Sequence, residues 1–331
     1  MKRRDWIIKA GIGLAIWKLP LNVYSKKYAM KEQTNFDVII IGGSYAGLSA
    51  AMSLGRSLRG VLIVDSGLPC NRYTPHSHNF ITHDGAVPRE IAAKAKSQVL
   101  KYKTVTYHQD IALSGQKINN GYQINTRSGK TFQGKKLVFA TGVRDVFPAI
   151  KGFEECWGKS VIHCPYCHGY EFKGQKTAIL ANGERAIHIA GLVHNLTEDL
   201  SIVTRGKADF SEEQWKTLER NNIRVIEREV VEISHHNGQI NAVIFDDGTH
   251  ENYDVAYAAI PFEQHCAIPV SLGCELTEMG HLKVDQFQQT TIEGIFASGD
   301  CSAMLRTVAY AVSTGNLAGA MVNHQLVQDG F

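Results

Sequence analysis

The sequence contains one closely spaced pair of cysteines, Cys164 and Cys167, in the segment His163-Cys164-Pro165-Tyr166-Cys167-His168-Gly169-Tyr170. Two cysteines separated by two residues can close a small disulfide ring, and their surroundings can lower the pKa of one thiol. His168 follows the pair directly, and an imidazole with an ordinary pKa of about 6.5 can move protons to and from thiols at neutral pH. The spacing therefore predicts reversible thiol–disulfide chemistry, with Cys164, Cys167 and His168 as candidate catalytic residues.

Three other interpretations of this pair compete. A structural zinc site needs a second pair of ligands, and no other pair in the chain has a convincing spacing, so we expect no metal site. Cys-x-x-Cys-His also matches the attachment motif for c-type haem, although no obvious axial ligand lies nearby. A thioredoxin-like domain would carry the pair near the start of a βαβ pattern, whereas this pair lies in the middle of the chain. The other cysteines are expected to be packed thiols: Cys70, Cys156, Cys266, Cys274 and Cys301.

A glycine-rich turn near the N-terminal end predicts a nucleotide site. An apolar run over residues 36–41 has the length of a buried strand and breaks into Gly42-Gly43-Ser44-Tyr45-Ala46-Gly47. A helix is expected over residues 48–54, and the next strand ends on Asp65. This order is typical of a dinucleotide-binding unit, in which the helix N-terminus binds the pyrophosphate and the acid binds a ribose. The candidate cofactor-binding residues are Gly42, Gly43, Ser44, Ala46, Gly47 and Asp65, with Ser44 at the usual place of the second glycine.

A second pattern of this kind occurs near the other end of the chain. Residues 291–298 are expected to form a short strand that ends in Gly299-Asp300, and a helix-like segment follows from Thr307 to Leu326. With both patterns, the sequence resembles the two-dinucleotide-binding flavoprotein reductases, whose FAD site has one half at each end of the chain. The resemblance implies that Gly299 and Asp300 bind FAD, and that Arg306 and Thr307 lie near the isoalloxazine ring.

Two segments between these half-sites fit the same resemblance. Residues 137–142 end in the Ala-Thr-Gly at which the chain of these reductases leaves the FAD domain. The segment His78-Asn79-Phe80 resembles their flavin-contacting loop, with Asn79 at the asparagine position. The histidines around it, His76, His78 and His83, are as readily surface-loop residues as catalytic bases.

The cysteine pair lies just past that strand, as it does in the low-molecular-weight thioredoxin reductases, which the sequence resembles over residues 36–328. The resemblance implies that Cys167 is the charge-transfer thiol facing the flavin and that Cys164 is the interchange thiol meeting the external substrate. It also implies an α/β fold with two Rossmann-like domains, the second inserted into the first, and a homodimer. His168 replaces the usual aspartate, and Cys-Pro-x-Cys-His-Gly-Tyr-Glu is closer to the dithiol-oxidase branch of the superfamily.

The nucleotide site of the inserted domain departs from the reductase pattern. Where the reductases have Gly-x-Gly-x-x-Ala, residues 181–186 read Ala-Asn-Gly-Glu-Arg-Ala, so Ala181 replaces the tight-turn glycine. The two arginines expected at the 2′-phosphate of NADPH are replaced by Arg205 and Gly206. We therefore favour a domain that serves as a scaffold for the redox pair over one that binds NADPH.

The expected function is FAD-dependent exchange with a small dithiol or disulfide, or with a thioredoxin-like protein. Two alternatives stay open: a conventional NADPH-dependent thioredoxin reductase, and a non-catalytic flavin redox sensor. The predicted domains are residues 36–150 and 262–331 for FAD, and the inserted residues 151–261 for the redox pair. A chain of 331 residues accommodates both domains, and its scattered basic residues, with a net charge of +3, do not favour nucleic-acid binding.

The first 35 residues form a separate segment. Arg3-Arg4 precedes a short apolar run from Ala10 to Trp17 and resembles a twin-arginine export signal. The run is too short to span a bilayer, and no clean cleavage site follows it. We expect an exported, periplasmic protein, with an uncleaved anchor or a disordered basic tail on a cytoplasmic protein as the alternatives.

Overall fold

The computed structural model describes residues 34–331. The predicted export segment, residues 1–35, lies outside the described residues except for its last two, and it stays a prediction. Within the described part of the chain, no helix combines the length and the apolar character that a membrane span requires.

A seven-stranded sheet carries the first predicted nucleotide site. Its order is β3-β2-β1-β6-β5-β4, and β17 also pairs with β6. The pairs among β1, β2, β3, β6 and β17 are parallel, whereas β4, β5 and β6 pair antiparallel. The strands are β1 (Asn35–Ile41), β2 (Val61–Asp65), β3 (Val105–Gln109), β4 (Ala112–Ile118), β5 (Gly121–Thr126), β6 (Thr131–Phe139) and β17 (Ile295–Ala297). The apolar runs of the parallel strands are buried, as expected for a sheet covered on both faces.

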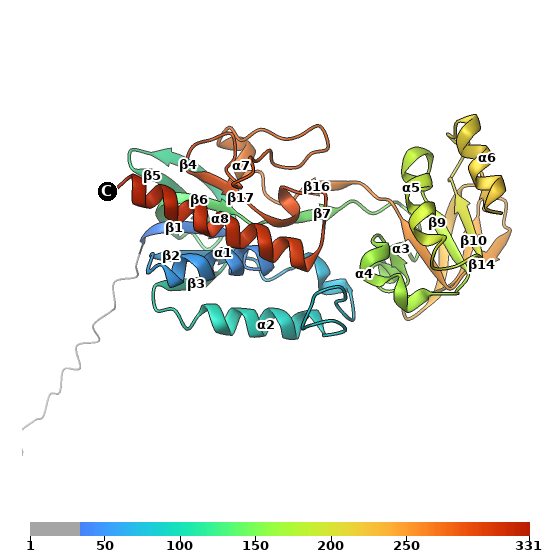
Figure 1. The fold of residues 1–331 in the computed structure, drawn as a ribbon, viewed down its shortest axis with the longest axis horizontal. Helices are drawn as coiled ribbons and strands as arrows, with labels where there is room; N and C mark the ends of the chain where they lie inside the picture. The colour runs from blue at the N-terminus through green and yellow to red at the C-terminus, as the bar shows by residue number, and fades with distance from the viewer. Residues whose placement is uncertain (1–33) are drawn as a thin grey trace, which may run out of the picture. The chain divides into compact units, whose positions relative to one another are not determined.

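Helices α1 (Tyr45–Arg56) and α8 (Val308–Gln328) pack side by side against this sheet (Figure 1). They approach closely because two glycines of α8 face the backbone of α1. A Cβ atom at Gly319 would lie 2.6 Å from the Ala50 carbonyl oxygen, and one at Gly315 would overlap the Ala46 carbonyl. Two segments far apart in the sequence are thereby held together at one end of the sheet. The remaining helices of this part are α2 (Pro88–Val99) and α7 (Ile268–Ser271).

A second parallel sheet, of order β11-β10-β9-β15-β8, carries the redox segment. Its strands are β8 (Val161–Ile162), β9 (Thr177–Leu180), β10 (Leu200–Val203), β11 (Arg224–Ile226) and β15 (Val255–Ala258). An antiparallel sheet adjoins it in sequence, with strands β12 (Val230–His236), β13 (Gln239–Phe245) and β14 (His250–Asn252). The helices here are α3 (Phe153–Cys156), α4 (Pro165–His168), α5 (Gly183–Val193) and α6 (Glu212–Arg220). The α/β class with parallel sheets is the one predicted.

Two short strands link the sheets. The chain leaves the first sheet through β7 (Val143–Asp145) and returns through β16 (Phe262–Gln264), which pairs with β7 antiparallel. Residues 34–331 form one compact unit. The boundaries at residues 150 and 261 therefore stay a prediction, although the exit after Gly142 and the return at Phe262 lie beside this pair of strands.

Candidate active site

The glycine-rich turn between β1 and α1 packs tightly against neighbouring backbone. Gly42 has a φ of 103°, and a Cβ atom there would overlap the Ala140 carbonyl. A Cβ atom at Gly47 would overlap the Gly42 carbonyl, so both positions require glycine. Ser44 is the N-cap of α1, and its side chain makes no capping hydrogen bond. The serine therefore leaves the first N–H groups of the helix free to bind an anion.

Asp65, at the end of β2, fixes this turn. Its carboxylate accepts hydrogen bonds from the Gly43 N–H at 2.9 Å and the Gly67 N–H at 3.1 Å. It also accepts one from the Tyr107 hydroxyl, and burial together with this carboxylate raises the pKa of the Tyr107 phenol. The first role of Asp65 in the structure is thus to hold the glycine turn, while its predicted contact with a ribose stays a prediction.

The second half-site follows β17. Gly299 has a φ of 75°, and its N–H donates a hydrogen bond to the Thr314 hydroxyl of α8 at 3.1 Å. Asp300 comes next, and burial raises the pKa of its carboxyl, an effect that Arg306 opposes. Thr307 is the N-cap of α8, where its hydroxyl accepts a hydrogen bond from the Tyr310 N–H at 3.1 Å. The predicted residues Gly299, Asp300 and Thr307 thus lie together at the N-terminal end of α8.

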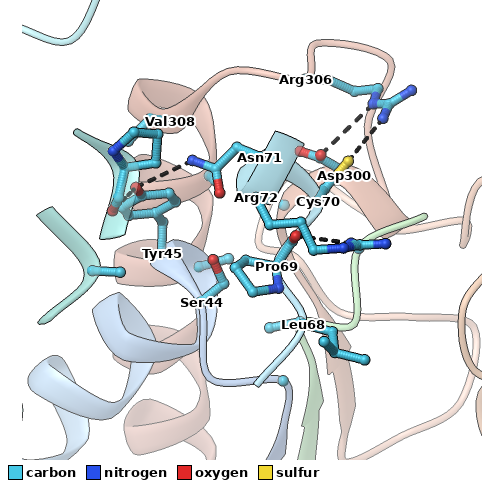
Figure 2. A pocket seen from close by; sticks show the side chains of 18 of the residues that line it. Ser44, Tyr45, Leu68, Pro69, Cys70, Asn71, Arg72, Asp300, Arg306 and Val308 are labelled. Atoms are coloured by element: carbon cyan, nitrogen blue, oxygen red, sulfur yellow. Dashed lines mark hydrogen bonds and ion pairs between the residues drawn. The ribbon is translucent and has the colours of Figure 1, made fainter. Parts of the chain in front are cut away.

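Arg306 is held by acidic groups and by a thiol. Its guanidinium makes two hydrogen bonds to the Asp145 carboxylate, at 2.8 and 3.2 Å, and its Nε lies 3.7 Å from Asp300. The same guanidinium donates a hydrogen bond to the Sγ of Cys70 at 3.1 Å; Figure 2 draws this contact as a dashed line. A bidentate arginine–carboxylate pair of this kind fixes the plane of the guanidinium. Asp145 on β7 therefore orients Arg306 within the site.

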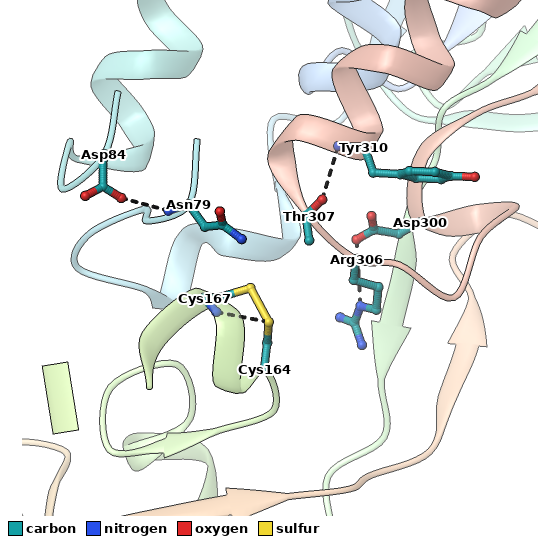
Figure 3. Close-up of a disulfide and its surroundings, with 8 residues drawn as sticks. All are labelled: Asn79, Asp84, Cys164, Cys167, Asp300, Arg306, Thr307 and Tyr310. Atoms are coloured by element: carbon teal, nitrogen blue, oxygen red, sulfur yellow. Dashed lines mark hydrogen bonds and ion pairs between the residues drawn. A yellow bond between two sulfur atoms is a disulfide. The ribbon is translucent and has the colours of Figure 1, made fainter. Parts of the chain in front are cut away.

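Cys164 and Cys167 form a disulfide at α4, with their Cα atoms 5.3 Å apart. Cys164 is the N-cap of the helix, and its sulfur accepts a hydrogen bond from the Cys167 N–H at 3.2 Å. Cys167 lines a cavity of about 780 Å³, whereas Cys164 is not among the residues that line it. Figure 3 shows the disulfide with Asn79 and Thr307, which line the same cavity. The order in which the two thiols react stays a prediction.

Two histidines flank the disulfide in the sequence and line the same cavity. Burial lowers the pKa of His168, and His78 lowers it further, whereas Glu171 acts in the opposite direction. Burial lowers the pKa of His163 to about 4, with a smaller contribution from Arg306. A neutral His168 can accept a proton from a thiol.

The corresponding turn of the inserted domain is closed by its own side chains. The side-chain Oδ1 of Asn182 accepts hydrogen bonds from the Gly183 and Asp209 N–H groups, both at 2.9 Å. The Asn182 amide donates a hydrogen bond to the Lys207 carbonyl oxygen at 2.9 Å. A Cβ atom on Gly183 would lie 3.7 Å from the Asp209 carboxylate. The loop over residues 207–209 therefore lies over the N-terminus of α5, where a pyrophosphate would bind in an intact site.

Comparison with known proteins identifies the family. Residues 36–315 match the family model described as pyridine nucleotide-disulphide oxidoreductase. The chain belongs to this family.

Individual members of the family are similar over nearly their whole length. Thioredoxin reductase tcpT from Claviceps purpurea (strain 20.1) is 33% identical over 311 residues, covering 91% of this chain and 97% of the relative. The crystal structure of a putative thioredoxin reductase, TrxB from Bacillus anthracis, is 30% identical with a TM-score of 0.85, covering 89% of this chain and 100% of its own. The crystal structure of an oxidoreductase from Agrobacterium tumefaciens is 35% identical with a TM-score of 0.83, covering 89% of this chain and 99% of its own. The predicted fold and enzyme class are confirmed: the chain is a thioredoxin reductase-like FAD disulfide oxidoreductase.

The residues of the large cavity fit FAD, the cofactor that members of this family use. The cavity runs from the glycine turn at α1 to Asp300 and Arg306 before α8. The Ser298 hydroxyl and the Arg306 Nε are buried and have no hydrogen-bond partner among the described residues. Buried polar atoms are normally satisfied, so these two are available to a bound ligand. The free N–H groups at α1 and the polar atoms near α8 suit the two ends of a dinucleotide.

The cavity brings together most of the predicted site residues. Those that line it are Gly42, Gly43, Ser44, Ala46, Asp65, Asn79, Cys167, His168, Gly299, Asp300, Arg306 and Thr307. Gly47 and Cys164 are not among its lining residues. Gly47 packs against the Gly42 carbonyl within the turn, and of the two disulfide-bonded cysteines only Cys167 lines the cavity. Asn79 has a left-handed backbone with a φ of 57°, and its N–H donates a hydrogen bond to Asp84 at 2.8 Å. The individual roles of these residues in binding and catalysis stay predictions.

The structure adds residues that the sequence did not single out. Asp145 orients Arg306, and His163 lines the cavity next to the redox pair. Cys70 and Cys266 are half-buried and line the cavity, with Cys266 also packed against the core; the other three free cysteines are buried. Cys70 could have been found from its place in the loop after β2, since that loop borders the cofactor in a dinucleotide-binding unit.

Proposed function

We propose that this chain oxidises an external dithiol and delivers the electrons to FAD through Cys164 and Cys167, without using NADPH as the electron donor. The observation that carries the proposal is the contrast between the two turns. The turn at α1 opens onto the cavity that Cys167 lines, whereas Asn182 and Asp209 cover the N-terminus of α5. The substrate is a small dithiol or a thioredoxin-like protein, in line with relatives named as thioredoxin reductases.

The chemistry at the pair is a two-step thiol–disulfide exchange. A substrate thiolate attacks the Sγ of Cys164, so that the Cys164–Cys167 bond breaks and Cys167 leaves as a thiolate. The second substrate thiolate then attacks the substrate sulfur of the mixed disulfide and releases Cys164. The substrate loses two electrons and two protons: the cysteine pair gains the electrons, one proton goes to His168 and the other to the released Cys164. His168, neutral because burial lowers its pKa, accepts a proton from the attacking thiol.

FAD, when bound in the cavity, supplies a two-electron acceptor for the reduced pair. The residues around it hold it in place: the N–H groups of the α1 turn suit its pyrophosphate, and Asp300 suits its polyol. Cys167 is the member of the pair that lines this cavity, so it is the thiol that gives up the electrons. Re-forming the Cys164–Cys167 bond would release two electrons, which FAD would accept, and the remaining thiol protons.

Binding of NADPH is expected to be weak for two physical reasons. A charge-assisted hydrogen bond contributes about 1.5–3 kcal/mol, so the loss of one guanidinium at Gly206 weakens binding roughly ten- to over a hundredfold. The carboxylate of Asp209 lies close to the N-terminus of α5, where its charge would repel a pyrophosphate. The route through the cysteine pair depends on neither position.

The test is anaerobic rapid mixing of the purified flavoprotein with NADPH or with dithiothreitol, followed by flavin absorbance. We expect dithiothreitol to bleach the flavin fast and NADPH to bleach it slowly. The Cys164→Ser/Cys167→Ser double variant should lose the dithiol reaction, whereas Cys156→Ser, a buried cysteine outside the pair, should keep it. Bleaching by micromolar NADPH within milliseconds would overturn the proposal and favour a conventional thioredoxin reductase.

We also propose a homodimer exported through the twin-arginine route. Export would suit a protein that folds around its cofactor before crossing the membrane, and Arg3-Arg4 before a short apolar run supports it. The dimer rests on the resemblance to thioredoxin reductases. Light scattering of the purified flavoprotein tests the dimer, and a mass near 36.6 kDa would contradict it.

A further inference from the structure

A small cluster of histidines and carboxylates borders His168. The His78 Nδ1 lies 3.4 Å from Glu171 Oε1 and 3.6 Å from Asp84 Oδ1. The rings of His78 and His168 meet nearly at right angles, at 88°, with their centroids 6.1 Å apart. His78 comes from the loop that precedes α2, whereas His168 and Glu171 belong to the redox segment. Three side chains from two distant parts of the sequence therefore meet beside the disulfide.

The loop that carries His78 is held in a defined conformation. Its two ends are joined at Ser77, which donates a hydrogen bond to the Ala86 carbonyl at 2.8 Å and accepts one from the Gly85 N–H at 2.9 Å. The Asn79 N–H donates a hydrogen bond to the Asp84 carboxylate at 2.8 Å, which places that carboxylate beside His78. His78 itself is only 19% exposed. A histidine held in this way is more than a surface-loop residue.

The two imidazoles of this cluster have different charged neighbours. Two imidazoles at this distance repel each other when both are protonated, and only His78 lies against two carboxylates. Burial and the charge of His78 both lower the pKa of His168. The other titratable groups that face the cluster are His76, His163 and the phenol of Tyr257 on β15.

We propose that His78 is a positioning residue for the dithiol reaction: held by Glu171 and Asp84, it keeps the proton off His168. His168 thereby stays free to accept the proton of the attacking substrate thiol. This inference rests on the proposed function, because it assigns His168 as the base of that reaction. No electrons move in this step; the S–H bond of the substrate breaks, and an N–H bond forms on His168.

The effect of removing His78 has a definite sign. As the pH falls through the pKa of His168, the base is lost and the rate of reduction declines. Replacing His78 by glutamine removes a neighbouring positive charge, so the pKa of His168 rises and the decline begins at higher pH. We call this decline in rate at low pH the limb of the profile. A charge at this separation, partly screened by two carboxylates, should move the limb by about one pH unit. Below the limb, the variant should be about tenfold slower than the wild type, and above it the two should agree.

The experiment compares rates of flavin reduction by dithiothreitol across the pH range in the wild type, His78→Gln, His78→Lys and His83→Gln. His78→Lys keeps a positive charge and should restore the wild-type limb. His83 is on the same loop but outside the cavity, so His83→Gln should match the wild type. NMR titration of the His168 ring, assigned with His168→Gln, measures the same shift without turnover. FAD content and circular dichroism check that each variant is folded.

The outcomes separate the two proposals. If dithiothreitol does not reduce the wild type, the proposed function fails. If it reduces the wild type but His78→Gln keeps the wild-type pH profile and the wild-type titration of His168, the role of His78 is refuted while the function stands. If His78→Lys shifts the limb as far as His78→Gln does, the charge of His78 is not the cause and the inference is wrong.

Discussion

Replacing Gly319 by alanine is expected to weaken FAD binding and lower thermal stability, although Gly319 lies at no predicted site. Gly319 is in the middle of α8, where a new Cβ atom would lie 2.6 Å from the Ala50 carbonyl oxygen of α1. Helices α1 and α8 each carry one half of the predicted FAD site at their N-terminal ends. A change that separates the two helices therefore separates the two halves of the site.

The size of the effect follows from the distances. Ordinary van der Waals contact begins at 3.4 Å, so the helices must take up the difference, 3.4 − 2.6 = 0.8 Å. Because the close atom is a backbone oxygen that cannot rotate away, the overpacking cost is in the upper part of the usual range, about 2–3 kcal/mol, and the gain in helix propensity from glycine to alanine offsets about 1 kcal/mol of it. The net loss is about 1–2 kcal/mol. If this strain destabilises only the FAD-bound protein, it corresponds to a roughly five- to thirtyfold weaker FAD affinity. The unfolding midpoint should fall by roughly 2–6 °C.

The assay is FAD titration of the apoprotein by flavin fluorescence, together with thermal unfolding of the holoprotein. Gly191→Ala is the matched control, because this glycine lies in helix α5 with nothing within 4 Å of its added Cβ atom. The control should be neutral or slightly stabilised, whereas Gly315→Ala should be worse than Gly319→Ala because its Cβ atom would overlap the Ala46 carbonyl. Equal affinities and midpoints for Gly319→Ala and Gly191→Ala would refute the close approach of α1 and α8.

Three further predictions concern the cofactor, the thiols and the N-terminal segment. Cys164→Ser should leave Cys167 as a thiolate against oxidised flavin and give a long-wavelength charge-transfer band, which Cys167→Ser should lack; the reverse pattern would exchange the two roles. Asp300→Ala should be purified largely without flavin, and a full complement of FAD in this variant would remove Asp300 from the site. Replacing Arg3 and Arg4 by lysine should keep the protein in the cytoplasm, since twin-arginine recognition does not accept plain charge; native protein found only in the cytosol would contradict export.

The sequence predicted the fold well where the pattern is local. The apolar run before Gly42 becomes the buried strand β1, and the segment after Thr307 becomes α8, which ends at Gln328, two residues beyond the predicted end. The predicted helix over residues 48–54 extends over Tyr45–Arg56, because α1 begins directly after its N-cap at Ser44. The packing of α8 on α1 could not be predicted, since it depends on contacts between residues more than 250 positions apart.

The candidate site was predictable to the extent that its chemistry follows from residue type and spacing. Cys-x-x-Cys-His and the two glycine turns are patterns of this kind. Asp145 and His78 carry no such pattern, because their roles depend on which groups the fold brings next to Arg306 and His168. The same holds for Asn182: the sequence indicated the loss of a glycine beside it, but only the structure shows its side chain fastening Lys207 and Asp209 over the helix.

Cys70 and Cys266 line the cavity together with Cys167, and their pKa values decide whether they can compete with the redox pair as nucleophiles. A thiol attacks as its thiolate, so its pKa decides how much of it is reactive at neutral pH. Burial raises the pKa of Cys70 and of Cys266. At Cys70 the nearby guanidinium of Arg306 opposes this rise, but the carboxylates of Asp145 and Asp300 oppose the guanidinium in turn. The net shift at both thiols is upward, so both are mostly protonated at neutral pH and compete little with the disulfide pair as nucleophiles.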